Sequence, residues 1–305
     1  MTEPLLELRH VSRTFGGGGG PFSQRQTVAL KDFSLVIDAD QPTIIAVVGE
    51  SGSGKTTMAR IALGLDTPTS GEVLYQGKDL RKLSGKEWRE YRRGLQAILQ
   101  DPFGVYNSFY KVDHVLTTPL RKFGLGGSSE KRRELIESAL VAVGLQPEDT
   151  LGRYPHQLSG GQRQRLMVAR TLLLRPRVIV ADEPVSMIDA SLRATVLANL
   201  LQLKHEYGIS LIYITHDLTT ANEISDRIVV LYHGEVVEAG PPQEVIDRPR
   251  HPYTRMLIDS IPEPDPDHAW GEHGLVDGAD EEEVTTALLS SVTTGSPDGG
   301  GREHV

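Results

Sequence analysis

Residues 43–65, TIIAVVGESGSGKTTMARIALGL, decide the fold of this chain. An apolar run, TIIAVV, is followed by glycine-rich residues and then by a segment in which Met58, Ile61, Ala62 and Leu65 recur at helical spacing. A short continuous apolar run predicts a buried strand, and the i, i+3, i+4 spacing predicts a helix with one apolar face. We therefore expect a strand, a glycine-rich loop and a helix in this order.

The loop of this stretch, Gly49–Thr56, matches the pattern G-x-x-x-x-G-K-[S/T] in full. Its glycines allow backbone N–H groups to converge on phosphate oxygens, and the start of the helix adds favourable partial charge. The pattern predicts that the Lys55 ammonium reaches the β- and γ-phosphates of ATP and that the Thr56 hydroxyl is a ligand of Mg²⁺. The predicted ATP-binding residues here are Gly49, Glu50, Ser51, Gly52, Ser53, Gly54, Lys55, Thr56 and Thr57.

Two other interpretations of the loop fit less well. A glycine-rich turn with an accidental lysine has no need to lie between a strand and a helix. A dinucleotide-binding fingerprint has the glycine order G-x-G-x-x-G, whereas this loop has G-x-x-G-x-G. The sequence therefore favours a phosphate-binding loop.

A second apolar run, Val178–Ala181, ends in two carboxylates, Asp182 and Glu183. In phosphate-loop NTPases an acid at such a strand end helps to hold the metal, and we predict that Asp182 does so through water. Glu183 comes one residue later, where it could accept a proton from the water that attacks the γ-phosphate. Two acids at a strand end could also be merely solvated, but the phosphate loop upstream favours the catalytic interpretation.

A third motif, Leu158-Ser159-Gly160-Gly161-Gln162, comes just before a helical pattern near 160–174. Ser159 is a suitable N-cap residue. The two glycines at the start of the helix leave backbone donors open to an anion. Taken alone, the motif fits a simple capped helix as well as it fits an anion site.

The remaining pattern predicts an α/β protein. Apolar runs at Ile209–Thr215 and Arg227–Tyr232 indicate further buried strands, and helical segments near 160–174 and 191–207 lie between the runs. Strands that alternate with helices favour a mostly parallel sheet covered on both sides.

Two regions depart from this alternation. The segment from about 81 to 157 is charged and helix-rich, without a convincing core strand after Leu99, and we expect it to be a helical insertion between two halves of the sheet domain. The early segments LLELRHV and VALKDFSLVI alternate in the manner of strands and predict a smaller antiparallel sheet. The five glycines at 16–20 between them indicate a loop.

The composition narrows the class of protein. The chain has 305 residues, 38% of them hydrophobic, which suffices for an ordinary globular core. No run approaches the roughly 18 apolar residues that span a bilayer, and the start, MTEPLLELRH, lacks the pattern of a signal peptide. If the protein works at a membrane, we expect another chain to hold it there. The absence of cysteine excludes disulfides, thiolate metal sites and a cysteine nucleophile.

Charge is distributed unevenly along the chain. The formal net charge is -9, from 32 Lys and Arg residues and 41 Asp and Glu residues. Residues 263–305 hold eleven acids and one arginine, a local charge of -10, which leaves +1 for the other 262 residues. A nearly neutral body argues against a general nucleic-acid-binding surface. Because the segment 263–305 is acidic and rich in Gly, Ser, Thr and Asp, we expect it to be a disordered tail.

Taken together, these motifs resemble the ATPase subunits of ABC transporters, over roughly residues 5–262. The resemblance implies an α/β, P-loop NTPase fold: an ABC ATPase domain, residues 1–262, with a RecA-like mostly parallel sheet, a small antiparallel β subdomain and a helical subdomain insertion at about 81–157. It also implies that the chain binds ATP and Mg²⁺, and that ATP hydrolysis is coupled to transport of a solute across a membrane.

The resemblance extends the set of site residues. LSGGQ looks like the signature of the family, which implies that Ser159, Gly160, Gly161 and Gln162 serve the ATP bound by the opposite protomer. This would make each complete site the product of two subunits.

Four single residues match family positions. Gln100, in LQDPFG, matches the glutamine that touches Mg²⁺ and the attacking water, and His216, in YITHD, matches the histidine that senses the γ-phosphate. Asp189, in SMIDAS, matches a loop that crosses to the partner subunit. Phe15 stands in the place of the aromatic residue that stacks on adenine, with a simple core aromatic as the alternative.

A narrower resemblance points to the oligopeptide/dipeptide importer branch. RYPHQLSGGQRQR (153–165) and HPYTRMLIDSIP (251–262) look like sequences of this branch, which implies a C-terminal extension at about 241–262. QDPFGVYNSFYKV lacks the SLNP-like sequence that commonly follows the glutamine, and DADQPTIIAVV replaces the usual glycine and glutamate before the strand. Some members hold cysteine-bound iron–sulfur clusters, which a chain without cysteine cannot do. Because the branch also serves nickel, glutathione and oligosaccharide systems, the cargo stays open.

The partners that the resemblance implies are transmembrane permease subunits, a second ABC ATPase subunit and, indirectly, an extracytoplasmic solute-binding protein. The resemblance favours a heterodimer of two related ATPases over a homodimer. It implies that the chain is a peripheral subunit at the cytoplasmic face of the membrane. No nucleic-acid partner is expected. An exporter with separate ATPase chains and a soluble ABC ATPase are the alternatives. The soluble class is disfavoured because the chain has neither a long coiled coil nor a second ATPase domain. The sugar-importer ATPases add a long regulatory domain, for which the residues after Gly240 are too few.

Overall fold

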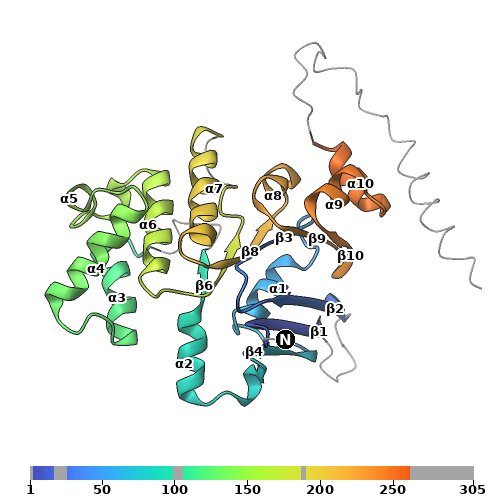
Figure 1. Cartoon of the computed structure of the whole chain (residues 1–305), viewed down its shortest axis with the longest axis horizontal. Helices are drawn as coiled ribbons and strands as arrows, with labels where there is room; N and C mark the ends of the chain where they lie inside the picture. Colours follow the sequence, from blue (N-terminus) through green and yellow to red (C-terminus); the bar gives the residue numbers. More distant parts are fainter. Residues whose placement is uncertain (1–2, 17–25, 99–105, 187–189, 262–305) are drawn as a thin grey trace, which may run out of the picture. The chain divides into compact units, whose positions relative to one another are not determined.

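The computed structural model of the chain is shown in Figure 1. The chain divides into two units, 1–261 and 262–305, and all described residues belong to the first. The predicted tail, 263–305, lies outside the described residues. The structure describes residues 3–16, 26–98, 106–186 and 190–261, without the side chains of 190–192.

A six-stranded sheet forms the centre of the described unit. The strand order is β10-β9-β3-β8-β7-β6, and every neighbouring pair is parallel except β9 and β10. The inner strands are mostly apolar runs because helices or strands cover both of their faces. The strands are β3 (Ile44–Val48), β6 (Leu95–Ile98), β7 (Val178–Asp182), β8 (Ser210–Thr215), β9 (Arg227–Tyr232) and β10 (Glu235–Gly240).

Strand β3 shows how the sheet divides the core in two. Its alternate residues Ile44, Ala46 and Val48 belong to one buried apolar cluster, and Ile45 and Val47 belong to another. Successive side chains of a strand point to opposite faces of the sheet. Each face of the central sheet therefore carries its own core.

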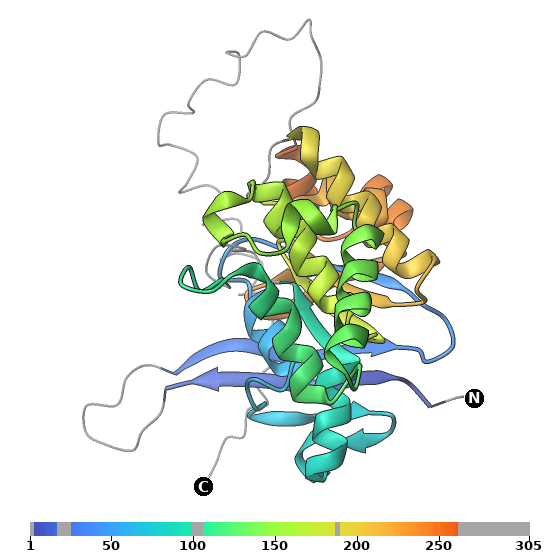
Figure 2. The same ribbon diagram turned by 90° about the vertical axis from the view of Figure 1, so that its left-hand side faces the viewer.

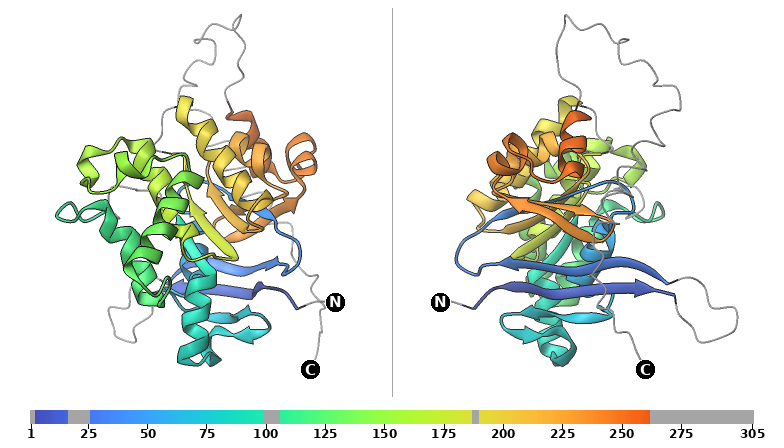
Figure 3. Two further views of the ribbon diagram at one scale, coloured as in Figure 1. Left: turned by 60° about the vertical axis from the view of Figure 1, so that its left-hand side comes forward. Right: turned by 90° about the vertical axis from the view of Figure 1, so that its right-hand side faces the viewer.

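A small antiparallel sheet and one helix cover the first face. The sheet has the order β2-β1-β4-β5 and lies across the central sheet from the main helical layer (Figure 3). In β2 the buried residues Phe33, Leu35 and Ile37 alternate with exposed ones, as expected for a sheet with one covered face. The elements of this layer are β1 (Leu6–Phe15), β2 (Thr27–Ile37), β4 (Ser70–Tyr75), β5 (Lys78–Asp79) and α1 (Lys55–Ala62).

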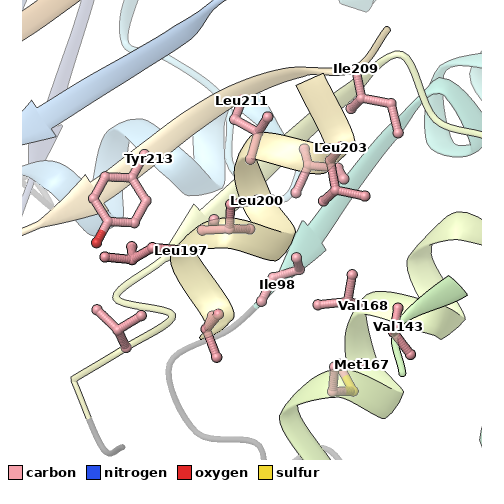
Figure 4. Close-up of a cluster of buried hydrophobic side chains, with 14 of the residues drawn as sticks. Ile98, Val143, Met167, Val168, Leu197, Leu200, Leu203, Ile209, Leu211 and Tyr213 are labelled. Carbon is pink, nitrogen blue, oxygen red and sulfur yellow. The ribbon is translucent and has the colours of Figure 1, made fainter. Parts of the chain in front are cut away.

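Helices cover the second face. Side chains of α7, such as Leu200 and Leu203, pack against Leu211 and Tyr213 of β8, and Met167 and Val168 of α6 belong to the same cluster (Figure 4). Helices α3, α4 and α6 lie together in one layer (Figure 2). The helices are α3 (Val112–Phe123), α4 (Ser129–Ala142), α5 (Pro147–Thr150), α6 (Gly160–Leu172), α7 (Ala190–His205), α8 (Leu218–Ile224), α9 (Pro242–Asp247) and α10 (Pro252–Asp259), with 3₁₀ turns at Leu80–Lys82 and Pro155–Gln157.

The fold class, a mostly parallel α/β sheet with an antiparallel subdomain and helices, is confirmed, but the helical insertion predicted at 81–157 needs correction. Its first part contains β6, which pairs in parallel with β7, and helix α2 (Gly85–Gly94), which packs on the antiparallel layer. The buried Tyr91 of α2 lies with its ring centroid 5.1 Å from that of Tyr75 in β4. The sequence pattern missed β6 because LQAI is only four residues long and two of them are half-buried. The helices between β6 and β7 are therefore the part inserted into the sheet.

No helix in the part of the chain that the structure describes is both long and apolar enough to cross a membrane.

Candidate nucleotide-binding site

The parallel strands bring the phosphate loop, Glu183 and His216 to one edge of the sheet. Strand β8 lies between β3 and β7, with Thr215 opposite Val48 on one side and Ile214 opposite Asp182 on the other. The phosphate loop (Gly49–Thr56) follows β3, and His216 follows β8. The carboxyl ends of the three strands are thus level, which is where open α/β sheets bind ligands.

Two glycines explain the shape of the phosphate loop. Gly54 has φ 108°, and a Cβ there would lie 2.4 Å from the carbonyl oxygen of Ala29, so that a larger residue would be both strained and in steric conflict. Gly52 has φ 83°, but no atom lies within 4 Å of the place a Cβ would take. At Gly54 the loop backbone therefore packs closely against the rest of the protein. At Gly52 the loop faces open space, which leaves room for a phosphate group.

Lys55 is buried at the start of α1, with 6% of its surface exposed. Its ammonium donates hydrogen bonds to the carbonyl oxygens of Gly49 and Glu50, the latter at 2.6 Å. Burial lowers the pKa of Lys55, and the carboxylates of Glu183, Asp182 and Glu50 oppose this shift. The ammonium is thus stabilised by oxygen atoms around the loop, and phosphate oxygens would favour the charged form further.

Asp182 and Glu183 lie at the end of β7. Burial raises the pKa of Asp182, the charge of Glu183 raises it further, and Lys55 lowers it. An oxygen ligand whose charge is disfavoured by burial gains most from a nearby cation. These properties fit a residue that holds a hydrated Mg²⁺.

Glu183 has an unusual backbone conformation, with φ 44°. Its N–H donates to Ile214 at 2.9 Å, and its carbonyl accepts from the N–H and hydroxyl of Ser186. Its carboxylate lies 3.2 Å from His216 Nδ1. Positive φ in a residue other than glycine is strained and concentrates at functional sites. The strain here is compatible with a carboxylate held in one orientation beside the histidine.

The donor set of the loop also fits a phosphate ligand and Mg²⁺. Ser53 is 4% exposed, and its hydroxyl oxygen has no hydrogen-bond partner among the described residues. A buried unpaired hydroxyl is a position where a ligand oxygen can complete the hydrogen bonding. The described residues contain no cluster of three or more His, Cys, Asp or Glu side chains able to hold a metal. Mg²⁺ needs none, because it is commonly bound through one or two protein oxygens, water and substrate phosphates. Of the other loop residues, Ser51 and Thr56 are exposed and Thr57 is half-buried.

The LSGGQ motif forms the N-terminus of α6. Ser159 is the N-cap: its hydroxyl accepts from the Gln162 N–H at 3.2 Å, and the Gln162 side chain accepts from the Ser159 N–H at 2.9 Å. Ser159 and Gly160 are exposed, whereas Gly161 is buried. This capping box explains why the helix begins here. Because α6 packs in the opposite core from α1, the motif and the phosphate loop of one chain lie on elements at different faces of the sheet.

Phe15 ends β1 and is 42% exposed, so it is not a core aromatic. The guanidinium carbon of Arg13 lies 4.7 Å from the centroid of its ring. An exposed ring held by a cation from one side has surface left for another planar group.

Two predicted site residues, Gln100 and Asp189, lie outside the described residues. The sequence interpretation also missed Tyr253 as a residue that contacts the loop: its hydroxyl oxygen accepts a hydrogen bond from the Glu50 N–H at 2.8 Å. In the sequence, HPYTR indicates only a resemblance to the oligopeptide/dipeptide branch. The contact joins two segments 203 positions apart, and neither segment carries a local signal for it.

Comparison with known proteins agrees with this geometry. Residues 30–186 match the family model described as ABC transporter, and residues 237–283 match the one described as oligopeptide/dipeptide transporter, C-terminal region. The oligopeptide transport ATP-binding protein OppF of Haemophilus influenzae is 41% identical over 268 residues, covering 87% of this chain and 80% of OppF. A putative peptide import ATP-binding protein of Brucella ovis is 42% identical over 269 residues, covering 88% of this chain and 82% of that protein.

A solved structure matches the fold. The dimeric, post-hydrolysis structure of the ATP-binding cassette MJ0796, bound to ADP and Pi, has a TM-score of 0.66 and 29% identity, covering 78% of this chain and 98% of that chain. The chain therefore belongs to the ABC transporter family, in its oligopeptide/dipeptide branch, as an ATP-hydrolysing subunit.

Proposed function

We propose that this chain is the energy-coupling subunit of an oligopeptide importer and hydrolyses ATP at the edge formed by β3, β7 and β8. The observation that carries the ATPase site is the meeting of the phosphate loop, the Glu183 carboxylate and His216 at this edge. The oligopeptide assignment is supported by the match at 237–283 and by the names of the similar proteins. Dipeptides or a related solute such as an oligosaccharide are the alternative cargoes.

ATP binding is assigned to the loop and to Phe15. The Lys55 ammonium and the loop amides bind the β- and γ-phosphates, and the Ser53 hydroxyl is available to a phosphate oxygen. Phe15 stacks on adenine, since its ring is exposed and held by Arg13.

Mg²⁺ would be held by Thr56, by Gln100 and, through water, by Asp182. When bound, the ion neutralises negative charge on the β- and γ-phosphates. Thr56 offers an exposed hydroxyl at the start of α1, and Asp182 offers a carboxylate whose charged form a cation would stabilise.

Hydrolysis follows from the position of Glu183. Its carboxylate takes a proton from water while the water oxygen bonds to the γ-phosphorus and the bond to the bridging oxygen of ADP breaks. His216 lies 3.2 Å from this carboxylate and orients it, and we assign its ring to the γ-phosphate. Gln100 orients the same water.

The complete site is proposed to require two subunits. The exposed N-terminus of α6, with Ser159, Gly160, Gly161 and Gln162, serves the ATP of a partner, because it lies on the opposite face of the sheet from α1. Asp189 belongs to the loop that crosses to this partner. The similar cassette MJ0796 was solved as a dimer with ADP and Pi bound. We favour a second, related ATPase as the partner over a second copy of this chain.

The transport assignment places the chain at the cytoplasmic face of the membrane, on permease subunits that receive solute from an extracytoplasmic binding protein. Expression of the tagged chain with its native complex and purification in detergent tests this. The expected result is copurification of a permease and a solute-binding protein that binds oligopeptides, with ATPase activity stimulated by peptide. Copurification with nucleic acid or ribosomes, and no permease, would refute the importer assignment.

A further inference from the structure

The C-terminal segment of the ATPase domain reaches the phosphate loop. Tyr253, near the start of α10, is 5% exposed, and its hydroxyl oxygen accepts a hydrogen bond from the N–H of Glu50 at 2.8 Å. Glu50 is the second residue of the loop, and 203 positions separate the two residues in sequence. This loop amide is therefore held by the protein itself.

The tyrosine is fixed in position by its neighbours. Its ring centroid lies 4.1 Å from that of Tyr232, with an angle of 32° between the ring planes. Its N–H donates to Nδ1 of His251, the N-cap of α10, at 3.2 Å, and Pro252 occupies the first helical turn. A buried ring with a capped helix behind it places the hydroxyl in one orientation, so that the hydrogen bond to Glu50 has little freedom to shift.

The β9–β10 hairpin contacts both the segment that carries Tyr253 and the phosphate loop. Tyr232 ends β9, and Gly234, in the turn to β10, donates its N–H to the Ser53 carbonyl at 2.9 Å. Glu238 of β10 accepts hydrogen bonds from the N–H groups of Arg250 and His251, at 2.9 and 3.1 Å. The hairpin thus holds the phosphate loop directly and holds the segment that carries Tyr253.

We propose that Tyr253 is a positioning residue of the phosphate loop, and that through it the C-terminal segment sets the affinity for ATP. The inference rests on the proposed ATP site. A loop that binds phosphate with its backbone amides binds more tightly when their orientation is set beforehand. Fixing the Glu50 peptide orients the start of the loop, and the Gly234 contact fixes it at Ser53.

Tyr253→Phe tests the proposal because it removes the hydroxyl and keeps the ring. We expect the KM for ATP to rise about two- to tenfold, the range for losing one neutral hydrogen bond, with kcat changed by less than about twofold because the groups that act on water are untouched. Tyr207→Phe, the same change at an exposed tyrosine after α7, is the matched control and should keep the wild-type KM. Melting temperatures of both variants verify that they are folded.

Amide hydrogen exchange gives a second measurement that needs no nucleotide. In the ATP-free protein, the Glu50 amide should exchange faster in Tyr253→Phe than in wild type, because its acceptor is gone. Unchanged ATP binding in Lys55→Ala would refute the proposed ATP site. The exchange rate of the Glu50 amide would still test the hydrogen bond to Tyr253, because that measurement does not depend on ATP. An unchanged KM in folded Tyr253→Phe overturns the positioning role, and an unchanged exchange rate overturns the contact itself.

Discussion

Replacement of Glu183 by glutamine isolates the proton-accepting role of this side chain. The carboxylate is 18% exposed and becomes an amide of the same shape, so that packing is kept. The strained backbone depends on the N–H bond to Ile214 and on Ser186, neither of which involves the carboxylate. The contact with His216 can persist, because an amide offers both a donor and an acceptor. What the change removes is the ability to take a proton, which costs about 10²–10⁴-fold in rate, or about 3–5 kcal/mol of transition-state stabilisation.

The measurement is kcat for ATP hydrolysis, with the Kd of a fluorescent ATP analogue measured in parallel. We expect kcat to fall by about 10²–10⁴-fold with Kd close to wild type, and the variant to accumulate as an ATP-bound dimer. Glu137→Gln on α4, which forms a surface ion pair with Arg133, is the control for the chemical change. A fall in kcat of less than about tenfold, below the range for a lost general base, would show that Glu183 is not the base.

The remaining predictions address binding, charge and assembly. Lys55→Ala should abolish hydrolysis, because it removes the cation at the phosphates; near-normal turnover would contradict the loop assignment. Asp182→Asn should raise the melting temperature of the nucleotide-free protein, because burial raises the pKa of Asp182 and its ionised form therefore destabilises the fold. The rise in melting temperature should increase with pH as the wild-type carboxyl ionises, and it should vanish in acid, where that carboxyl is protonated. Phe15→Ala should raise the KM for ATP with little change in kcat, and an unchanged KM would exclude stacking. If the chain self-associates, mixing Lys55→Ala with Ser159→Arg should restore part of the activity, since one interface would be intact; full activity of a monomeric Ser159→Arg protein would refute the shared site.

Local patterns sufficed to predict most of the residues that the fold brings to the proposed ATP site. The phosphate loop and the carboxylates at the end of β7 each come at the end of a buried apolar run, and parallel strands bring such ends to one edge. His216 follows a buried run too, but only the family resemblance singled it out. The capped start of α6 could also be predicted, because Ser159 and Gln162 are three residues apart and satisfy each other. In each case the deciding residues are neighbours in sequence.

Features that depend on distant contacts could not be predicted in this way. β6 has four residues, and only its pairing with β7 makes it a strand of the central sheet. β10 has no fully apolar face: two of its six residues are exposed at its start and one is buried at its end. The bond from Glu50 to Tyr253 joins residues of which each looks ordinary in its own segment. Such contacts become visible only when the fold has brought the segments together.

A buried hydrogen bond joins helix α6, which Ser159 caps, to the backbone that follows Glu183. Gln164, 1% exposed in the second turn of α6, donates from Nε2 to the carbonyl oxygen of Pro184 at 2.8 Å. Pro184 follows Glu183 directly, and Ser159 caps the same helix. In the proposed dimer, Glu183 serves the ATP of its own chain and Ser159 serves that of the partner. A displacement of the backbone after β7 would break a buried hydrogen bond unless α6 followed. In the proposed dimer this contact would therefore couple the two sites through each subunit.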